Sequence, residues 1–322
     1  MILVTGAAGF IGYHVSNALL AQGRAVVGID NLNDYYDPAL KQARLDRLEA
    51  QPGFQFLKAD IADRDVILSL AKTFPRITGI IHLAAQAGVR HSLIDPYSYV
   101  RSNVEGQLIM LELARRIDGL KHMVYASSSS VYGANDKQPF SIEDPVDTPL
   151  SLYAATKRSG ELMAYTYAHL YGIPLTGLRF FTVYGPWGRP DMAAYIFASK
   201  IMAGEPITVF NNGNMRRDFT FIDDIVDGVI RCLETPPSGT PPQRVYNIGN
   251  NRSEDLMRFI SLIEESLGMK AEMRFDVMQP GDVQETFADI DAIRDDLGFN
   301  PATPIDAGIP AFIEWFRSYN QR

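Results

Sequence analysis

The chain has 322 residues, of which 46% are hydrophobic and 21% are charged, and its formal net charge is −8. This composition is that of an ordinary globular protein with room for one large domain or two closely packed ones, and its acidic balance argues against a nucleic-acid or anionic-membrane partner. The single cysteine, Cys232, excludes an internal disulfide and fits a reducing, cytoplasmic compartment.

No segment has the pattern of an export signal, a membrane span or a metal site. An apolar run begins at Met1, which leaves no room for a signal peptide, and no apolar run reaches the length of a membrane span. The histidines are scattered along the chain rather than clustered: His14, His82, His91, His122 and His169. We therefore expect a cytoplasmic protein without a metal ion.

The first thirty residues predict a strand, a glycine turn, a helix and a second strand that ends at Asp30. Gly6, Gly9 and Gly12 allow backbone N–H groups to approach a diphosphate at a helix N-terminus, where the helix dipole favours negative charge. An acid after the second strand accepts hydrogen bonds from the adenosine ribose and repels a 2′-phosphate, so Asp30 predicts NAD rather than NADP. A tight turn without a ligand is the alternative for the GxxGxxG spacing, but the flanking strands and Asp30 favour a nucleotide.

Apolar runs alternate with helical patterns over the first 180 residues. Strands are predicted near 54–57, 77–83, 122–126 and 174–181, and helices over 63–73, 97–118 and 153–171. This alternation predicts an α/β fold with a doubly wound parallel sheet of the Rossmann type. Ligands of such sheets bind beyond the carboxyl ends of the strands. The residues that follow the strands are therefore site candidates: Asp30, Asp60, Ala84, Ser128 and Thr182.

The pattern changes after about residue 180. Residues 184–191 predict an ordered loop, 219–222 and 245–248 predict strands, and 254–267, 290–297 and 306–319 predict helices. The proline-rich stretch 235–243 predicts a surface connection. We expect an NAD-binding Rossmann domain over 1–180 with added strands within 218–250, and a smaller α/β substrate lobe over 181–217 and 251–322.

Tyr153 and Lys157 lie four residues apart at the start of a helical pattern, so their side chains share one helical face. The serines at 127–130 follow a predicted strand and offer a third hydroxyl. A neighbouring Lys⁺ and a positively charged nicotinamide both favour the phenolate of a tyrosine. Such a phenolate takes the proton of a secondary alcohol while hydride leaves to NAD⁺. A purely structural Tyr–Lys pair is the alternative, and the nucleotide fold and the serine-tipped strand count against it.

Seven segments carry a resemblance to a known family: 5–12, 30–33, 82–85, 127–133, 153–157, 179–186 and 217–219. Over essentially its whole length the chain resembles the extended short-chain dehydrogenases/reductases that act on nucleotide sugars. Within that family, the segments 34–38 and 87–90 are most similar to the UDP-glucuronate 4-epimerase group.

The resemblance implies a role for each matched position. Tyr153 is the catalytic base, Lys157 binds the nicotinamide ribose and tunes Tyr153, and Ser128 supplies the catalytic hydroxyl where many relatives carry threonine. NAD is expected against the glycine turn, the acid after the second strand and the ends of the following strands: Gly6, Gly9, Phe10, Ile11, Gly12, Asp30, Asn31, Asn33, Asp60, Ile61, Leu83, Ala84, Ala85, Asn103, Tyr153, Lys157 and Phe180.

Three reactions are open after oxidation at C4 to a 4-keto sugar. Dehydratases of the family carry an Asp-Glu pair, and decarboxylases a Glu, just before Val-Tyr-Gly. Here those positions are Ser129 and Ser130, which supply no acid for elimination but offer hydrogen-bond donors to a carboxylate. We therefore expect hydride to return to the opposite face, which converts UDP-glucuronate to UDP-galacturonate.

Recognition of the sugar carboxylate needs a cation or several donors. Arg189 is the first candidate and Arg90 the second, with Thr182, Ser129 and Ser130 as neutral donors. A solvated loop arginine is the alternative for Arg189.

The resemblance also implies a binding site for the UDP portion. Arg217 pairs with the diphosphate, Phe210 packs against uracil, and Asp282 binds the uridine ribose or orders its loop. Relatives often carry arginine where Gln279 stands, so one diphosphate contact differs here.

Other interpretations stay open. One is a UDP-hexose 4-epimerase or a nucleotide-sugar dehydratase or decarboxylase, and another is an NAD-sensing binding protein, which the intact Ser128, Tyr153 and Lys157 disfavour. The apolar faces near 97–118 and 153–171 predict a homodimer, unless they pack only within their own sheet layer.

Overall fold

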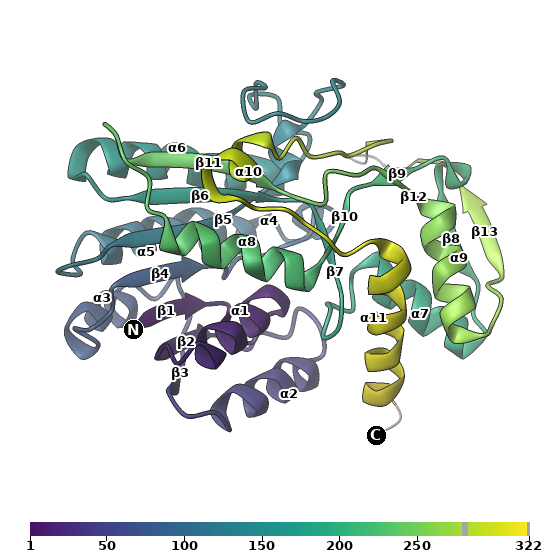
Figure 1. Ribbon diagram of the computed structural model, residues 1–322, viewed down its shortest axis with the longest axis horizontal. Helices are drawn as coiled ribbons and strands as arrows, with labels where there is room; N and C mark the ends of the chain where they lie inside the picture. Colours follow the sequence, from purple (N-terminus) through teal and green to yellow (C-terminus); the bar gives the residue numbers. More distant parts are fainter. Residues whose placement is uncertain (279–282, 321–322) are drawn as a thin grey trace.

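A computed structural model describes residues 1–278 and 283–320, and a parallel sheet of 7 strands forms its centre (Figure 1). The spatial order is β11 (Gln243–Ile248), β6 (Leu175–Phe180), β5 (His122–Ser128), β4 (Gly79–His82), β1 (Ile2–Thr5), β2 (Val26–Asp30) and β3 (Phe54–Lys58). β1 and β4 are buried along their whole length, as expected for strands covered on both faces. The expected doubly wound α/β fold is confirmed.

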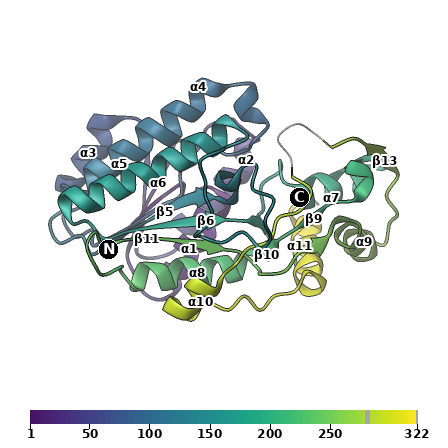
Figure 2. The same ribbon diagram turned by 90° about the horizontal axis from the view of Figure 1, so that it is seen from above.

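Helices cover both faces of this sheet. Figure 2 shows α3 (Arg64–Thr73), α5 (Gly106–Ala114) and α6 (Leu152–Tyr171) on one face and α8 (Ile222–Glu234) on the other. α1 (Phe10–Ala21) and α2 (Pro38–Glu49) belong with α8, because their buried side chains join the same hydrophobic cluster. A second cluster lies under α3, α5 and α6.

The helix α6 has clear start and stop signals. The Ser151 side chain accepts a hydrogen bond from the Ala154 N–H at 3.1 Å, which caps the first turn. The helix ends at Gly172, whose φ of +63° is left-handed and suits glycine. These signals agree with the expected helix over 153–171 and place Tyr153 in the first turn.

The prediction of a single continuous helix over 97–118 is wrong in detail. The structure has α4 (Pro96–Tyr99), a π-helical segment (Val100–Glu105) and α5, which ends at Ala114. The widened turn carries Asn103, whose side chain bonds both Gln86 and Thr156. Such π-segments often lie at functional sites.

Only one of the two strands expected to join the sheet from 218–250 does so. β11 pairs in parallel with β6, whereas β10 (Phe219–Phe221) pairs with β7 (Thr182–Tyr184) in a separate sheet of 2 strands. The chain leaves the central sheet after β6, so β10 meets this outgoing segment instead of a sheet edge.

A second lobe lies to the right of the sheet in Figure 1. It contains α7 (Ala193–Ala203), α9 (Leu256–Leu267), α11 (Ile305–Asn320) and the short pairs β8 (Ile207–Phe210) with β13 (Met273–Asp276) and β9 (Arg216–Arg217) with β12 (Glu254–Asp255). α10 (Asp291–Leu297) instead contacts β11 of the sheet.

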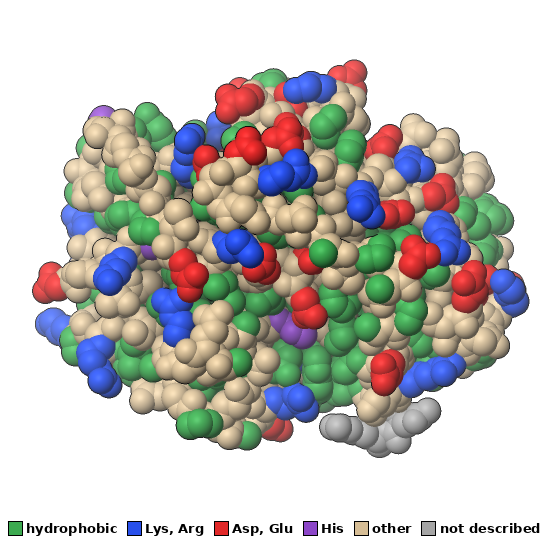
Figure 3. All heavy atoms as spheres, in the orientation of Figure 1, with side chains coloured by type: hydrophobic (Ala, Val, Ile, Leu, Met, Phe, Trp, Pro, Cys, Tyr) green, Lys and Arg blue, Asp and Glu red, His purple; other side chains and the backbone are tan. Residues whose placement is uncertain are grey.

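Acidic and basic side chains alternate on the face drawn in Figure 3 and form no continuous basic surface there. In the described part of the chain, no helix is long and apolar enough to cross a membrane. The same residues contain no group of three or more His, Cys, Asp or Glu side chains placed to hold a metal ion.

Candidate active site

The glycine turn brings β1, β4 and α1 into close backbone contact. A Cβ on Gly12 would lie 2.0 Å from the Gly6 carbonyl oxygen, and a Cβ on Gly6 would lie 2.9 Å from the Ala84 nitrogen. Gly6 also has a φ of +71°. α1 begins after Gly9 with no side-chain cap and no acid in its first turn. The N–H groups of Gly6, Ala7 and Gly9 bond to carbonyls within the protein, so the N–H groups in the first turn of α1, residues 10–12, are the ones left for an anionic ligand.

Asp30 lies at the carboxyl end of β2 and is almost fully buried. Its carboxylate accepts hydrogen bonds from the N–H groups of Ala8 and Leu32 at 3.1 and 2.9 Å. Two contacts do not use all the lone pairs of a carboxylate, so Asp30 keeps acceptor capacity for ribose hydroxyls.

The asparagines after β2 order the backbone of their own loop. The Asn31 side chain accepts from the Asn33 N–H at 3.1 Å. The buried ammonium of Lys41 donates to the Asn33 carbonyl and side-chain oxygens at 2.7 and 2.5 Å. Asn33 therefore lies beside Asp30, but its side-chain oxygen is already engaged by Lys41.

The next two strand ends are also held by local hydrogen bonds. The Asp60 side chain accepts from the Ala62 N–H at 2.8 Å, and Ile61 is buried beside it. After β4, the Ala84 N–H donates to the Thr5 hydroxyl at 3.1 Å. Leu83 and Ala85 flank it.

Asn103 lies opposite the segment after β4, as expected, but its polar atoms are used within the protein. Its Oδ1 accepts from the Gln86 N–H at 2.8 Å, and its Nδ2 donates to the Gln86 carbonyl and the Thr156 hydroxyl at 2.9 and 3.0 Å. Asn103 therefore joins the end of β4 to α6.

The structure brings Ser128, Tyr153 and Lys157 together at the carboxyl end of β5. Ser128 is the last residue of β5, where it pairs with Phe180, and it donates to the Ser130 hydroxyl at 3.2 Å. The Lys157 Nζ donates to the Ala126 carbonyl at 3.0 Å and lies 6.0 Å from the centre of the Tyr153 ring. This geometry is that of an acid–base group supported by a hydroxyl and an ammonium.

Burial dominates the ionisation of this group. It raises the pKa of Tyr153, and a hydrogen bond from Ser128 and the charge of Arg189 only partly oppose the rise. Burial also lowers the pKa of Lys157 to about 8. The Lys157 ammonium donates to the Ala126 carbonyl, and its expected effect on the phenolate stays a prediction.

Ser127 has a different function from Ser128, because its side chain points away from the strand end. Its hydroxyl donates to the Glu161 carboxylate at 2.6 Å, one strand residue before Ser128. Glu161 also accepts from Arg179 at 2.9 Å through both oxygens and from Arg158 at 3.1 Å. Since Glu161 lies one helical turn after Lys157, this buried cluster fixes α6 against β5 and β6.

We expect Glu161→Gln to lower the free energy of unfolding at pH 7 by about 2 kcal/mol. Burial opposes ionisation of Glu161, but Arg179, Ser127 and Arg158 outweigh it and hold its pKa below the ordinary 4.5. A carboxyl with a depressed pKa stabilises the fold above its unfolded pKa and loses that effect as the pH falls through its folded pKa. Urea unfolding should therefore show the deficit shrinking below about pH 4.5.

The half-exposed Glu265 on α9 provides the control, because Glu265→Gln weakens only a loose contact to Arg258 at 3.7 Å and keeps an oxygen that accepts from the Ser261 hydroxyl, 2.8 Å away. Its unfolding free energy should change by less than about 0.5 kcal/mol. A Glu161→Gln deficit that stays constant from pH 7 to pH 4 would contradict the ion-pair explanation.

Arg189 is paired with an acid of its own loop. Its Nε and Nη2 donate to the two carboxylate oxygens of Asp191 at 3.0 and 2.5 Å, and the Tyr35 hydroxyl donates to the same carboxylate at 3.1 Å. Burial opposes the charge of Arg189, but Asp191 outweighs it and keeps the pKa of the guanidinium raised. Arg189 is therefore a partly buried cation, not a solvated loop arginine.

The other proposed substrate residues lie in two places. The Arg90 guanidinium stacks on the Phe210 ring at 5.0 Å, so Arg90 belongs with the expected base site. Arg217 lies on β9 and donates to the carbonyls of Arg216 and Gln284 at 2.8 and 3.0 Å. Asp282 and Gln279 lie outside the described residues.

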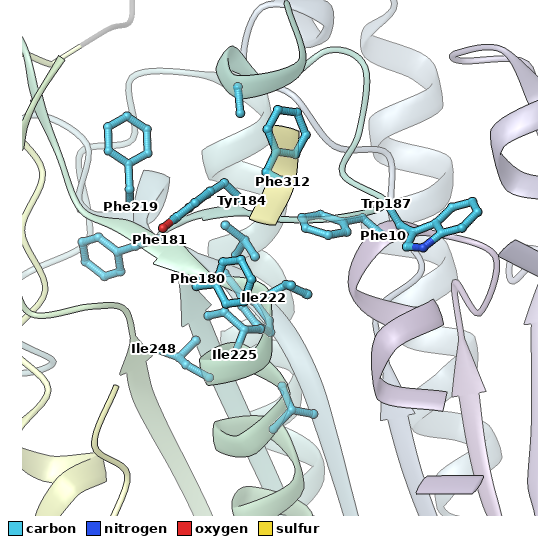
Figure 4. Packing of buried hydrophobic residues seen from close by; sticks show 14 of the residues in the cluster. Phe10, Phe180, Phe181, Tyr184, Trp187, Phe219, Ile222, Ile225, Ile248 and Phe312 are labelled. Atoms are coloured by element: carbon cyan, nitrogen blue, oxygen red, sulfur yellow. The ribbon is translucent and has the colours of Figure 1, made fainter. Parts of the chain in front are cut away.

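A pocket between the two lobes is lined both by a residue expected to bind the cofactor and by residues expected to bind the substrate. Its lining includes Phe10 of α1, Thr182 of β7 and Arg189. Phe10, Tyr184 and Phe312, which also line it, appear in Figure 4 among the packed side chains of the core. Phe10 at the start of α1 and Arg189 thus line the same small pocket.

Two cations of α2 were missed by sequence reasoning, Lys41 and Arg44. Both are buried, and Arg44 has no exposed surface at all. A signal was available, since Leu40, Lys41, Arg44, Leu45 and Leu48 recur at helical spacing on the buried face. Basic residues in such a pattern are more often solvated, so the spacing alone did not single them out.

Comparisons with known proteins agree with this geometry. A model of the NAD dependent epimerase/dehydratase family matches residues 2–249. The chain is 46% identical over 331 residues to UDP-glucuronate 4-epimerase 4 of Arabidopsis thaliana, covering 99% of this chain and 75% of the relative. It is 45% identical over 329 residues to a probable UDP-glucuronate 4-epimerase of Rhizobium meliloti, covering 98% and 96%. The solved structure of UDP-glucuronic acid 4-epimerase from Bacillus cereus, in complex with UDP-glucuronic acid and NAD, matches with a TM-score of 0.91 at 36% identity and covers 99% of each chain.

Proposed function

The chain belongs to the NAD dependent epimerase/dehydratase family, and from this membership we propose that it is an NAD-dependent isomerase that interconverts UDP-glucuronate and UDP-galacturonate at C4. The observation that carries the proposal is the end of β5, where Ser128 bonds to Tyr153 beside Lys157 and the two residues that follow Ser128 are serines, not acids. The relatives named above supply the substrate class.

The residues at the glycine turn fit NAD. Gly6 and Gly12 have no space for a side chain, the N-terminus of α1 is uncapped, and Asp30 retains acceptor capacity. Gly6, Gly9 and Gly12 would hold the diphosphate, Asp30 the adenosine ribose and Lys157 the nicotinamide ribose. When bound, NAD would accept the hydride from C4 of the sugar and give the same hydride back to C4.

Each residue of the catalytic group has a distinct task. Tyr153 takes the proton of the C4 hydroxyl during oxidation and returns a proton to the 4-keto oxygen during reduction. The single hydroxyl proton of Ser128 is donated to the Tyr153 phenolate before the proton transfer and to the 4-keto oxygen after it, and Lys157 holds a positive charge close to the Tyr153 ring. Since burial raises the pKa of Tyr153, the positive charge of the oxidised nicotinamide is needed to favour the phenolate.

The hydroxyls after β5 favour epimerisation over the other two fates of a 4-keto sugar. Elimination at C6 requires an acid–base group at this strand end, and Ser129 and Ser130 provide only neutral donors. The Glu161 carboxylate lies behind the strand and is held by two arginines, so it is not available for that role. Hydrogen bonds from Ser129, Ser130 and Thr182, together with the charge of Arg189, would bind the sugar carboxylate in a pose that disfavours decarboxylation.

The direct test is to incubate the purified protein with UDP-glucuronate and to follow the sugar signals by NMR. We expect UDP-galacturonate to accumulate without net reduction of NAD. UDP-xylose or a 4-keto pentose as the main product would contradict epimerisation. Comparable turnover of UDP-glucose would favour a UDP-hexose 4-epimerase, and bound NAD without any turnover would favour a sensor.

We expect Ser128→Ala to shift the acid limb of the pH profile of kcat upward by about one pH unit. The Ser128 hydroxyl lowers the pKa of Tyr153 through a hydrogen bond, so its loss leaves the phenolate less favoured and activity appears only at higher pH. Ser129→Ala is the matched control and should leave the limb in place. A uniform loss of activity at every pH would contradict this role of Ser128.

We also propose that the protein is a homodimer. Leu108 of α5 and Leu162, Tyr165 and Leu170 of α6 are large apolar side chains exposed to solvent, with exposures of 41, 54, 52 and 61%. Burial of such a surface against a second copy is the usual explanation for it. Light scattering should give twice the mass of the chain, and Leu162→Glu should lower it. A cytoplasmic location stays a prediction that cell fractionation tests.

A further inference from the structure

Arg44 is the most deeply buried cation of the described chain that bonds only to neutral groups. Its Nε and Nη2 donate to the Trp187 carbonyl at 3.1 and 2.6 Å, and Nη2 also donates to the Gly188 carbonyl at 3.2 Å. Its Nη1 donates to the Ala8 carbonyl at 3.0 Å and the Tyr36 hydroxyl at 2.8 Å. Among residues 1–278 and 283–320, no carboxylate forms an ion pair with Arg44. A buried charge in this state is costly unless an anion approaches it.

The two backbone segments joined by Arg44 belong to two different parts of the site. Ala8 lies in the glycine turn, between Gly6 and Gly9, where the cofactor diphosphate is expected. Trp187 and Gly188 directly precede Arg189, the expected partner of the sugar carboxylate. A single guanidinium therefore joins the glycine turn at 6–12, here called the cofactor turn, to the loop at 186–189, here called the substrate loop. The two segments are about 180 residues apart in the chain.

The substrate loop needs such support, because its backbone is strained at the contact. Trp187 has a φ of +61°, a left-handed conformation that a bulky residue rarely adopts. A residue keeps such a conformation only when its surroundings hold it there. The Trp187 carbonyl accepts two hydrogen bonds from Arg44, and the preceding Pro186 carbonyl accepts one from His14 of α1 at 2.9 Å.

We propose that Arg44 is a positioning residue that locks the Arg189 loop to the cofactor turn, and that its positive charge is balanced when the diphosphate of NAD occupies that turn. The guanidinium fork sets where Arg189 stands relative to the cofactor, and the charge strengthens retention of the cofactor. The inference rests on the proposed function, since it takes Arg189 as the partner of the substrate carboxylate.

Two variants test the planar guanidinium of Arg44 and its positive charge separately. Arg44→Lys keeps the charge but replaces a planar fork by one ammonium, which cannot bond the Ala8 and Trp187 carbonyls together with the same geometry. Its NAD content should match that of the unmodified enzyme, while the KM for UDP-glucuronate rises about tenfold. The KM for UDP-glucose, which has no carboxylate, should change by less than about twofold. Arg44→Met removes both fork and charge and should lose NAD as well.

The matched control is Arg47→Met, one turn further along α2. Arg47 also packs on Trp187, with its guanidinium 5.2 Å from the indole ring, and donates to the Tyr13 hydroxyl at 2.9 Å. It has no bond to the backbone of either segment. Removing it takes the same charge from the same helix, so NAD content and the KM for UDP-glucuronate should both stay within about twofold of the unmodified values.

The experiment measures NAD released from purified holoenzyme and the KM for both UDP-sugars. The proposal is overturned if Arg44→Lys leaves the KM for UDP-glucuronate unchanged, if it raises the KM for both sugars equally, or if Arg47→Met has the same effect. If Arg44→Met does not fold, the difference between the KM changes for UDP-glucuronate and UDP-glucose in Arg44→Lys still tests the proposal. Unmodified enzyme that fails to convert UDP-glucuronate would refute the proposed function instead.

Discussion

Replacement of Tyr153 by phenylalanine is expected to lower kcat for UDP-glucuronate by about 10³-fold while NAD stays bound. The variant loses one hydroxyl and keeps the ring, which packs edge-on against Tyr99 with the ring centres 6.0 Å apart. Lys157 keeps its hydrogen bond to the Ala126 carbonyl, so the side that is proposed to receive the nicotinamide ribose is unchanged. Removal of the proton acceptor without loss of binding is therefore the expected result.

The measurement pairs NMR turnover with the NAD content of the purified variant. Tyr171→Phe provides the matched control, because Tyr171 is the exposed last residue of the same helix and its replacement should leave kcat unchanged. Activity above about a tenth of the unmodified rate would show that Tyr153 is not the base. Loss of NAD from the variant would instead assign Tyr153 a structural role in cofactor binding.

Much of the Rossmann domain was predictable because its signals are local. The glycine turn, the apolar strands and the N-cap of α6 each depend on neighbouring residues, and the structure confirms the sheet and the ends of α6. The meeting of Ser128, Tyr153 and Lys157 follows from two such local facts, a strand end and a helical face. The general rule that parallel strands place their carboxyl ends together then supplies the rest.

The errors occur where long-range contacts decide. β10 is too short to specify its partner, and it pairs with β7 because the chain has already left the central sheet. The π-helical segment Val100–Glu105 depends on how Asn103 bonds to Gln86 and Thr156, and these partners lie far away in the sequence. No periodicity within a helix can report such contacts.

The polar and charged residues show the same limit more sharply. Ser127 and Ser128 are adjacent and chemically identical, but the alternation of a strand sends one to Glu161 and the other to the site. Arg44 looks like a surface residue until the loop at 186–189 folds over it. The pairing of Arg189 with Asp191 could be suspected from their spacing, yet their burial could not.

Replacement of Arg189 by alanine is expected to raise the KM for UDP-glucuronate by about 10²-fold and to change that for UDP-glucose by less than about threefold. A carboxylate in a partly buried site depends on its cation, whereas a C6 hydroxyl does not. Steady-state kinetics with both sugars checks this. An equal loss with both sugars would remove the role of Arg189 in carboxylate recognition.

Asp191 complicates the interpretation of that variant and also provides its control. Without Arg189, the Asp191 carboxylate keeps only the Tyr35 hydroxyl among its side-chain partners in the described chain, and its negative charge would repel the sugar carboxylate. Part of the loss in Arg189→Ala would then come from repulsion rather than from a missing contact. The double variant Arg189→Ala/Asp191→Ala removes both charges, so it should recover part of the affinity for UDP-glucuronate but not all of it. Full recovery would show that Arg189 only neutralises Asp191, and partial recovery would separate that neutralisation from direct binding of the substrate.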